Sequence, residues 1–391
     1  MMYDFDRIID RKGTDSVKYD LLYPVFGNKE VLPMWVADMD FEVPPFIREA
    51  IIRRAKHPVY GYTYRPRRFF QAVADWIRRR HGWEIKPGMI SFSPGIVPAL
   101  NMCVMAYTEP GDRIVVQPPV YFPFFTAVSN HHRVLVHNQL LEDNGYYRID
   151  FDHLEAQFKK GGKMFIFCHP HNPVGRVWTK QELEQLAGLC VRYRVPVISD
   201  EIHSDLVLPD HRHIPLASLG KEIADLTITC VAPSKTFNLA GLQSSAVIIT
   251  NAELKKGYDR MLDVVHVAGG NIFGMVAMEA AYSLGDDWLD QLIGYLEENY
   301  RVLREHLGAC APRIIVSPLE ATYLVWLDMS FLGMDDRELR EFIIEKAKLG
   351  LNEGTMFGPG GEQHQRMNIA TPRKILTEGV RRLCEAVKAA D

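Results

Sequence analysis

Short apolar segments alternate with amphipathic ones through the middle of the chain. Four segments have about the length of a strand and are apolar rather than alternating, namely residues 113–117, 163–168, 195–199 and 226–231. Such runs are typical of strands that are covered on both faces of a largely parallel sheet. We therefore predict an α/β domain.

Amphipathic segments separate these strands. Between the second and third strands, residues at helical spacing form one apolar stripe: Leu183, Leu186, Ala187, Cys190 and Tyr193. A strand, a helix and a strand form a βαβ unit, whose connection is right-handed. Upstream, residues 89–100 predict a strand, then Gly95, then a helix that begins near Val97.

The C-terminal third has a different rhythm. It predicts a long helix, a strand, a helix, a strand and a final helix, over residues 288–307, 321–329, 336–350, 366–370 and 375–390. We therefore expect a smaller α+β domain at 286–391, after a large domain at 46–285. Residues 1–45 lack this rhythm and are expected to form an arm that packs on the small domain or on a partner subunit.

Composition narrows the class of protein. A chain of 391 residues is too long for one small core, so we expect two domains. The net charge of -4 does not indicate binding to nucleic acid or to an anionic membrane. None of the six cysteines form a C-x-x-C pair, which indicates a reducing compartment rather than a disulfide framework. The N-terminus is charged, and no apolar run approaches membrane-spanning length. We expect a cytoplasmic protein.

Polar and aromatic side chains follow each predicted strand. In the order of the strands, they are Tyr121, Asn172, Asp200 with His203, and Ser234 with Lys235. Because ligands bind beyond the carboxyl ends of parallel strands, we expect these side chains to share one site.

This set of groups meets the demands of one cofactor. Gly95 and the helix start behind it can hold a phosphate with backbone N–H groups. Lys235 can form a Schiff base, and Asp200 can hold a proton on a ring nitrogen, as pyridoxal 5′-phosphate requires. Residues 230–242 contain no other charge, so desolvation would favour the neutral amine of Lys235.

Each feature alone has a plainer interpretation. An aspartate at a strand end usually caps a helix, and a loop lysine is usually solvated. His169 and His171 flank a proline without a third ligand at metal spacing, so we predict no metal site. Ser234 beside Lys235 could suggest a Ser–Lys hydrolase, but no oxyanion-hole motif accompanies them. The argument depends on all the features meeting at one sheet edge.

Several blocks of the sequence resemble a known family. Residues 170–179, 197–207 and 232–242 are similar to signature blocks of fold-type I, class I/II aminotransferase-like pyridoxal phosphate enzymes. Adding residues 32–41, 60–63 and 119–124, the chain resembles the PatB/MalY-type cystathionine β-lyase (C–S lyase) subgroup over nearly its whole length. The resemblance implies a mostly parallel seven-stranded sheet flanked by helices.

The resemblance also implies roles for individual residues. Lys235, Asp200 and Tyr121 would be catalytic, with Lys235 as the Schiff-base lysine and Tyr121 stacked on the cofactor ring. Asn172 and His203 would lie at the phenolic oxygen of the cofactor. The phosphate would be held by Gly95, Ile96, Val97 and Ser234, and by a tyrosine of the partner subunit, either Tyr60 or, as we favour, Tyr62. Arg366, with Asn172, would bind the substrate carboxylate.

Two positions depart from the wider family pattern. Many aminotransferases carry an arginine eight residues after the lysine, where this chain has Gln243. The lyase subgroup also tends to lack that arginine, which favours a lyase. Phe122 follows Tyr121, so the site entrance has one hydroxyl fewer than with two tyrosines.

The expected reaction is β-elimination from cystathionine or other cysteine S-conjugates, which gives a thiol, pyruvate and ammonia. Lys235 would remove the Cα proton as general base. Transamination of an amino acid is the main alternative, because it shares the early steps. A regulatory or partner-binding protein that keeps the cofactor fold is a third. A shared site predicts a homodimer.

Overall fold

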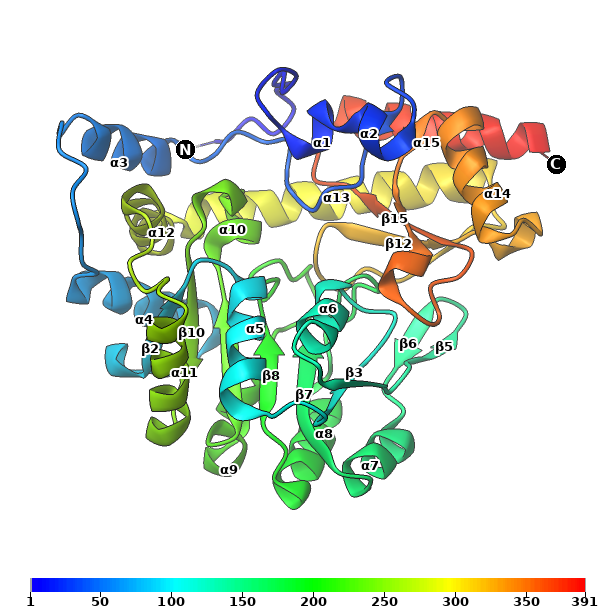
Figure 1. Ribbon diagram of the computed structural model, residues 1–391. Helices are drawn as coiled ribbons and strands as arrows, with labels where there is room; N and C mark the ends of the chain where they lie inside the picture. Colours follow the sequence, from blue (N-terminus) through cyan, green and yellow to red (C-terminus); the bar gives the residue numbers. More distant parts are fainter. Residues whose placement is uncertain (1, 391) are drawn as a thin grey trace.

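The structure is a computed structural model and describes residues 2–390. Its large domain is built on a seven-stranded sheet with the order β2-β10-β9-β8-β7-β3-β4. Only β10 runs against its neighbours, β2 and β9, so the sheet is mostly parallel, which confirms the predicted fold class (Figure 1). The strands are β2 (Ile90–Ser93), β3 (Arg113–Val116), β4 (Val134–His137), β7 (Gly162–Cys168), β8 (Val197–Asp200), β9 (Thr227–Val231) and β10 (Ser245–Ile249).

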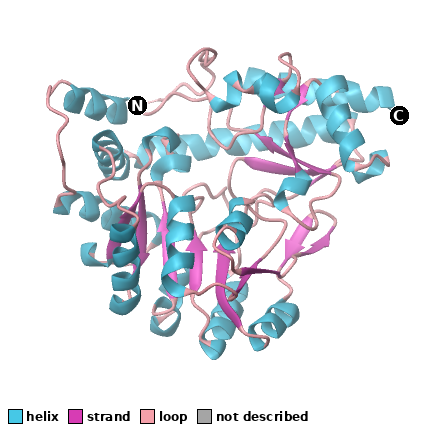
Figure 2. Cartoon of the chain, viewed as in Figure 1, coloured by secondary structure: helices cyan, strands magenta, loops and turns pink. Residues whose placement is uncertain are grey.

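Helices cover both faces of this sheet (Figure 2). Successive strand residues point to opposite faces, so Ile198 of β8 packs in one apolar cluster and Val197 in another. The first cluster includes α5 (Ile96–Tyr107), α6 (Pro123–Ser129) and α11 (Ala252–Val264). The second includes α7 (Phe151–Lys159), α8 (Lys180–Tyr193) and α9 (Lys221–Ala224). Burial on both faces explains the continuous apolar runs.

A third group of helices lies beside the β2 and β10 end of the sheet. Here α12 packs against both α3 and α4, and all belong to the largest apolar cluster. The helices are α3 (Pro45–Ala55), α4 (Arg67–His81) and α12 (Ile272–Leu284). β2 and α5 confirm the strand and helix that residues 89–100 predict, whereas the antiparallel β10 lies outside the predicted strand–helix pattern.

A second, antiparallel sheet with the order β11-β12-β15-β14 lies toward the C-terminus. Its strands are β11 (Ile315–Val316), β12 (Leu324–Asp328), β14 (Asn352–Glu353) and β15 (His364–Asn368), and its main helices are α13 (Asp286–Cys310), α14 (Asp336–Glu341) and α15 (Arg373–Ala390). The N-terminal arm joins this part of the molecule, because β1 (Leu32–Pro33) pairs with β13 (Leu349–Gly350). The exact domain boundaries stay predictions.

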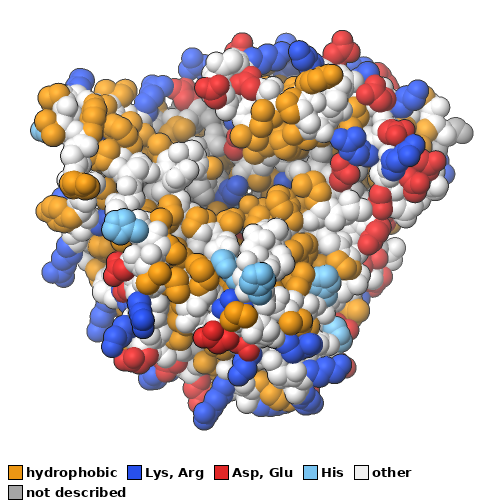
Figure 3. All heavy atoms as spheres, viewed as in Figure 1, with side chains coloured by type: hydrophobic (Ala, Val, Ile, Leu, Met, Phe, Trp, Pro, Cys, Tyr) orange, Lys and Arg blue, Asp and Glu red, His pale blue; other side chains and the backbone are white. Residues whose placement is uncertain are grey.

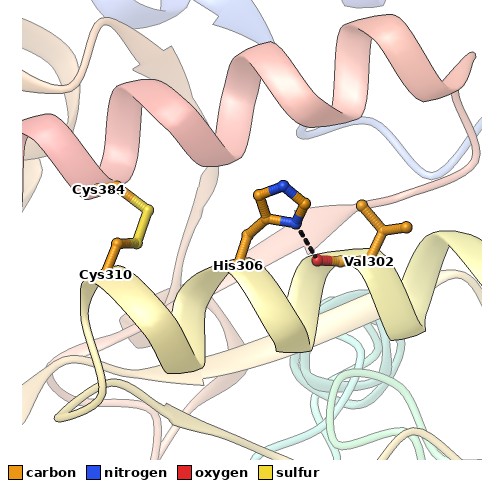
Figure 4. The surroundings of a disulfide bond; sticks show 4 residues. All are labelled: Val302, His306, Cys310 and Cys384. Atoms are coloured by element: carbon orange, nitrogen blue, oxygen red, sulfur yellow. Dashed lines mark hydrogen bonds between the residues drawn. A yellow bond between two sulfur atoms is a disulfide. The ribbon is translucent and has the colours of Figure 1, made fainter.

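The structure corrects the prediction about cysteines for one pair. Cys310 at the end of α13 and Cys384 on α15 form a disulfide, with Cα atoms 5.6 Å apart (Figure 4). The two cysteines are 74 residues apart, so the sequence does not predict that they pair. The packing of α13 against α15 brings them together. The other four cysteines are buried thiols.

Among residues 2–390, no helix combines the length and the apolar character needed to cross a membrane.

Candidate active site

A cavity of about 360 Å³ lies at the carboxyl ends of the parallel strands. Figure 3 shows the molecule hollowed on this side, between the part that carries α13 and the large sheet. The cavity brings together every predicted site residue except Tyr62: Gly95, Ile96, Val97, Tyr121, Asn172, Asp200, His203, Ser234, Lys235 and Arg366.

Lys235 lies on the short helix α10 (Pro233–Thr236), which directly follows the fully buried strand β9. Pro233 begins this turn, where its missing N–H costs nothing. The Nζ atom of Lys235 donates a hydrogen bond to the carbonyl oxygen of Ala37 (2.8 Å). Burial, and then the charge of Arg366, lowers the pKa of Lys235 to about 8, despite opposing effects from Asp38 and Asp200. About a tenth of this lysine is therefore a neutral amine at pH 7, far more than for a lysine with the usual pKa.

Asp200 ends β8, and its side chain is turned toward the cavity. Its Oδ1 atom accepts a hydrogen bond from the backbone N–H of Ile202 (3.2 Å), which holds the carboxylate in place. Burial raises the pKa of Asp200 to about 7, although this N–H and the charge of Lys235 lower it. A buried carboxylate that is this costly to ionise is well suited to a cationic partner.

His203 lies one turn further along the same loop and is also buried at the cavity. Burial, followed by the charges of Lys235 and Arg366, lowers its pKa well below the usual value, so the ring is neutral. Its Nδ1 atom is buried without a hydrogen-bond partner among the described residues. That nitrogen is closed off from the cavity, so His203 lines the cavity with the remainder of its neutral ring.

Arg366 reaches the cavity from β15 of the small domain. Its Nη1 atom donates to Asn172 Oδ1 (3.0 Å), and its Nη2 atom donates to the carbonyl oxygen of Trp35 (3.0 Å) and to Asn352 Oδ1 (2.5 Å). Burial lowers the pKa of Arg366 to about 10, so the guanidinium remains charged. The cavity thus contains a buried cation whose orientation is fixed by neutral oxygens, which suits a carboxylate ligand.

The start of α5 also lines the cavity. The first N–H groups of a helix have no acceptor within it, so those of Ile96 and Val97 can bind an anion. Ser234 also lines this cavity. Tyr121 lines the cavity as well, and burial and then the charge of Asp200 raise the pKa of its hydroxyl, so it stays protonated.

The N-terminal arm forms a wall of the cavity that the sequence analysis did not assign. The backbone carbonyl of Ala37 accepts hydrogen bonds from Lys235 and from the buried Tyr323 hydroxyl (2.9 Å). The carbonyl of Trp35 holds Arg366, as described above. Residues 32–41 are one of the blocks that resemble the family. Their role as backbone hydrogen-bond acceptors could not be predicted, because any residue type has a backbone carbonyl.

Asn352 and Tyr323 were also missed. They lie in the small domain, away from the strand ends of the large sheet. Only their contacts with Arg366 and Ala37 reveal them. Of the two family departures, Gln243 lines the cavity with a left-handed backbone (φ 46°), and Phe122 lines it beside Tyr121.

Tyr60 and Tyr62 do not line the cavity of their own chain. The Tyr60 hydroxyl donates to the carbonyl oxygen of Ala55 (2.6 Å), and its ring packs edge-on against Phe273. Tyr62 is fully exposed.

His169 and His171, weighed earlier as metal ligands, have other partners. The Nε2 atom of His169 bonds to the carbonyl oxygen of Ile214 (3.1 Å), and that of His171 to the carbonyl oxygen of Pro119 (2.9 Å).

Comparison with known proteins identifies relatives of the whole chain. Residues 29–387 match the family "Aminotransferase class I and II". The chain is 46% identical over 385 residues to cystathionine beta-lyase PatB of Bacillus subtilis (strain 168), covering 98% of this chain and 100% of the relative.

Two solved structures are also similar. Cystalysin from Treponema denticola, which contains a pyridoxal 5′-phosphate cofactor, superposes with a TM-score of 0.95 at 38% identity and 100% coverage of both chains. The pyridoxal phosphate-bound C–S lyase from Staphylococcus hominis superposes with a TM-score of 0.92 at 33% identity, covering 99% of this chain and 98% of the other.

Proposed function

Because the chain belongs to the class I and class II aminotransferase family, we propose that it is a pyridoxal 5′-phosphate-dependent carbon–sulfur β-lyase. Its substrates would be cystathionine or other cysteine S-conjugates, and its products a thiol, pyruvate and ammonia. One observation carries the proposal: Lys235, Asp200 and Arg366 share one cavity in a chain that matches a cystathionine β-lyase from end to end.

The residues around the cavity fit this cofactor. Lys235 would hold its aldehyde carbon as a Schiff base, and Asp200 its ring nitrogen. His203 and Asn172 both line the cavity, which supports contacts of these two residues with the phenolic oxygen. Tyr121 would stack on the ring. The phosphate would be held by Ser234, by the amides of Ile96 and Val97 and by that of Gly95 beside them.

The chemistry follows from the charges of these groups. The bound cofactor supplies an electron sink for negative charge at the substrate Cα. Arg366 binds the substrate carboxylate, and Asn172 keeps the guanidinium in place. Asp200 keeps a proton on the ring nitrogen. The Lys235 amine takes the Cα proton, because its pKa of about 8 leaves it partly unprotonated near neutral pH.

Transamination would use the same groups, so a turnover experiment must separate the two reactions. We expect the purified, cofactor-loaded protein to form pyruvate and methanethiol from S-methylcysteine with no oxo acid present. Gln243 supports this outcome, since it stands where many aminotransferases carry arginine. Turnover that requires an oxo-acid acceptor would instead establish an aminotransferase. A protein that binds the cofactor but turns over no amino acid would support the regulatory interpretation.

We further propose that the protein is a homodimer with a shared site. Tyr62 is fully exposed and the Tyr60 hydroxyl already has a backbone partner, which supports Tyr62 as the residue that reaches the partner's phosphate. Tyr62→Phe should then weaken cofactor binding several-fold, whereas Tyr60→Phe should have a smaller effect. A fully active monomer, measured by light scattering on the assayed sample, would contradict the dimer. The cytoplasmic location also remains a prediction.

A further inference from the structure

The loop after β8 has two faces, of which the proposed function uses one. Asp200 and His203 face the cavity. Asp205, at the end of the same loop, faces away from it, and its carboxylate is only 5% exposed. A buried carboxylate costs free energy unless its oxygens are well paired. The partners of Asp205 therefore indicate what its burial behind the cavity achieves.

Three hydrogen bonds satisfy the Asp205 carboxylate. Oδ1 accepts from Trp76 Nε1 (3.0 Å) and pairs with His81 Nε2 (2.8 Å), both on α4. Oδ2 accepts from Thr236 Oγ1 (2.8 Å). Thr236 is fully buried and directly follows Lys235. The carboxylate therefore joins the turn that carries Lys235 to a long helix of the large domain.

The contacts of the Lys235 turn show why this bond matters. Lys235 and Asn238 hydrogen-bond to the N-terminal arm, at the carbonyl oxygens of Ala37 and Met39. Thr236 instead ties the turn to the large domain, which also supplies Asp200. Adjacent Cα atoms are about 3.8 Å apart, so a shift of Thr236 moves Lys235 with it.

Other groups enclose the same carboxylate. The His81 ring packs edge-on against that of His213, 5.2 Å between centroids. His213 Nε2 in turn pairs with Glu201 Oε2 (2.8 Å), on the same outward face of the loop. Tyr282 of α12 stacks on Trp76. The two rings that hydrogen-bond the Asp205 carboxylate, those of Trp76 and His81, are thus each packed against a further ring.

We propose that Asp205 is a positioning residue that fixes Lys235 through the hydroxyl of Thr236. This inference rests on the proposed function, because it concerns the placement of the Schiff-base lysine relative to Asp200. Loss of the hydroxyl should let the turn move. The position and surroundings of the Lys235 nitrogen should then change, while substrate binding at Arg366 should change less.

The test removes one hydroxyl at two matched positions. Thr236→Val deletes the bond to Asp205 while keeping the side-chain volume, and Thr236→Ser restores the hydroxyl. Thr229→Val is the control, because Thr229 on β9 is equally buried but its hydroxyl has no partner in the described structure. Each variant is loaded with pyridoxal phosphate. The readouts are the pH midpoint of the Schiff-base absorbance, cofactor affinity, kcat, KM and Tm.

We expect Thr236→Val to shift the pH midpoint by about half a unit or more and to lower kcat about tenfold, with KM changed less than about twofold. Thr236→Ser and Thr229→Val should resemble the wild type. Asp205→Ala removes the acceptor altogether and should produce the same shift in midpoint and loss of kcat, but add little to them in the Thr236→Val background if both act through one bond. A Thr236→Val protein with a lower Tm but an unchanged midpoint and kcat would overturn this inference alone. A wild type that forms no Schiff base would overturn the proposed function as well.

Discussion

The two walls of the cavity contribute different kinds of groups. The strand ends of the large domain supply ionisable side chains, Lys235 and Asp200, whose pKa values burial has moved toward neutrality. The N-terminal arm supplies backbone carbonyls, those of Trp35 and Ala37, which hold Arg366 and Lys235. Under the proposed function, the first wall would carry out the chemistry, and the second would fix the groups that perform it.

The arm is itself held by a buried ion network. Lys18 Nζ pairs with Asp40 Oδ2 (2.8 Å), and Arg11 pairs with both Asp38 and Asp40. Lys18 and Asp40 are almost fully buried, so these charges are poorly screened by solvent. The comparison predicts that substitutions in the strand-end wall will affect the rate of chemistry most, and substitutions in the arm will mainly affect substrate binding.

The largest expected effect is that of Lys235→Ala. It removes both the Schiff-base nitrogen and the general base, so kcat for pyruvate formation should fall by about a thousandfold or more. The visible absorbance of the bound cofactor as a lysine Schiff base should also vanish. Lys256→Ala, which removes an exposed lysine on α11, is the matched control. Near-normal turnover in Lys235→Ala would refute the assignment.

Asp200→Asn should have opposite effects on stability and catalysis. In the cofactor-free protein the pKa of Asp200 is about 7, above the usual 3.8. Ionised Asp200 therefore destabilises the folded state most above pH 7, and this cost is absent below about pH 4, where the carboxyl is protonated in both the folded and the unfolded state. At pH 8 the cofactor-free variant should therefore have a higher Tm than the wild type and a free energy of unfolding larger by about 1–3 kcal/mol. At pH 4 the two proteins should be equally stable.

The same substitution should lower kcat of the loaded enzyme by about a hundredfold, because the ring nitrogen loses its charged partner. Thermal unfolding at both pH values and one rate measurement suffice. A variant that is less stable at pH 8 without cofactor would show that the Asp200 carboxylate has another favourable partner.

Arg366→Lys should raise KM more than it lowers kcat. An ammonium cannot reproduce the planar contacts with Asn172, Asn352 and a substrate carboxylate, so kcat/KM should fall by about ten- to a hundredfold. Arg381→Lys on the exposed face of α15 should change neither constant. If kcat instead falls by this factor while KM is unchanged, Arg366 acts in the chemical step rather than in substrate binding.

The smallest effect is expected in the arm. Arg11→Ala breaks the contacts with Asp38, Asp40 and the carbonyl of Met39, and should raise KM about threefold to tenfold with little change in kcat. Arg7→Ala in the same arm removes an exposed ion pair with Glu42, which should matter little. If the two variants behave alike, the arm does not control the site.

The strand-end wall could be predicted from the sequence, because each strand is an apolar run and each polar side chain follows it directly. The parallel topology then brings Asn172, Asp200 and Lys235 to one edge, as the cavity shows. Arg366 came instead from the family resemblance, since no local pattern separates it from other arginines.

The remaining features depend on tertiary packing. The carbonyl of Ala37 has no signature in residue type, and Asn352 bonds Arg366 only because β14 pairs with β15. The pairing of Cys310 with Cys384 depends on the packing of two helices that are distant in the sequence. The sequence does not predict the antiparallel β10, because only the four-residue helix α10 and a short 3₁₀ turn separate it from β9, with no amphipathic helix between the two strands.

One measurement tests the central claim most directly: the amount of thiol released per active site when the loaded enzyme meets S-methylcysteine without any oxo acid. We predict many equivalents of methanethiol per site, matched one to one by pyruvate, with no loss of the Lys235 Schiff base once substrate is exhausted. Release of no thiol, with conversion of the cofactor to its amine form once per site, would contradict the account.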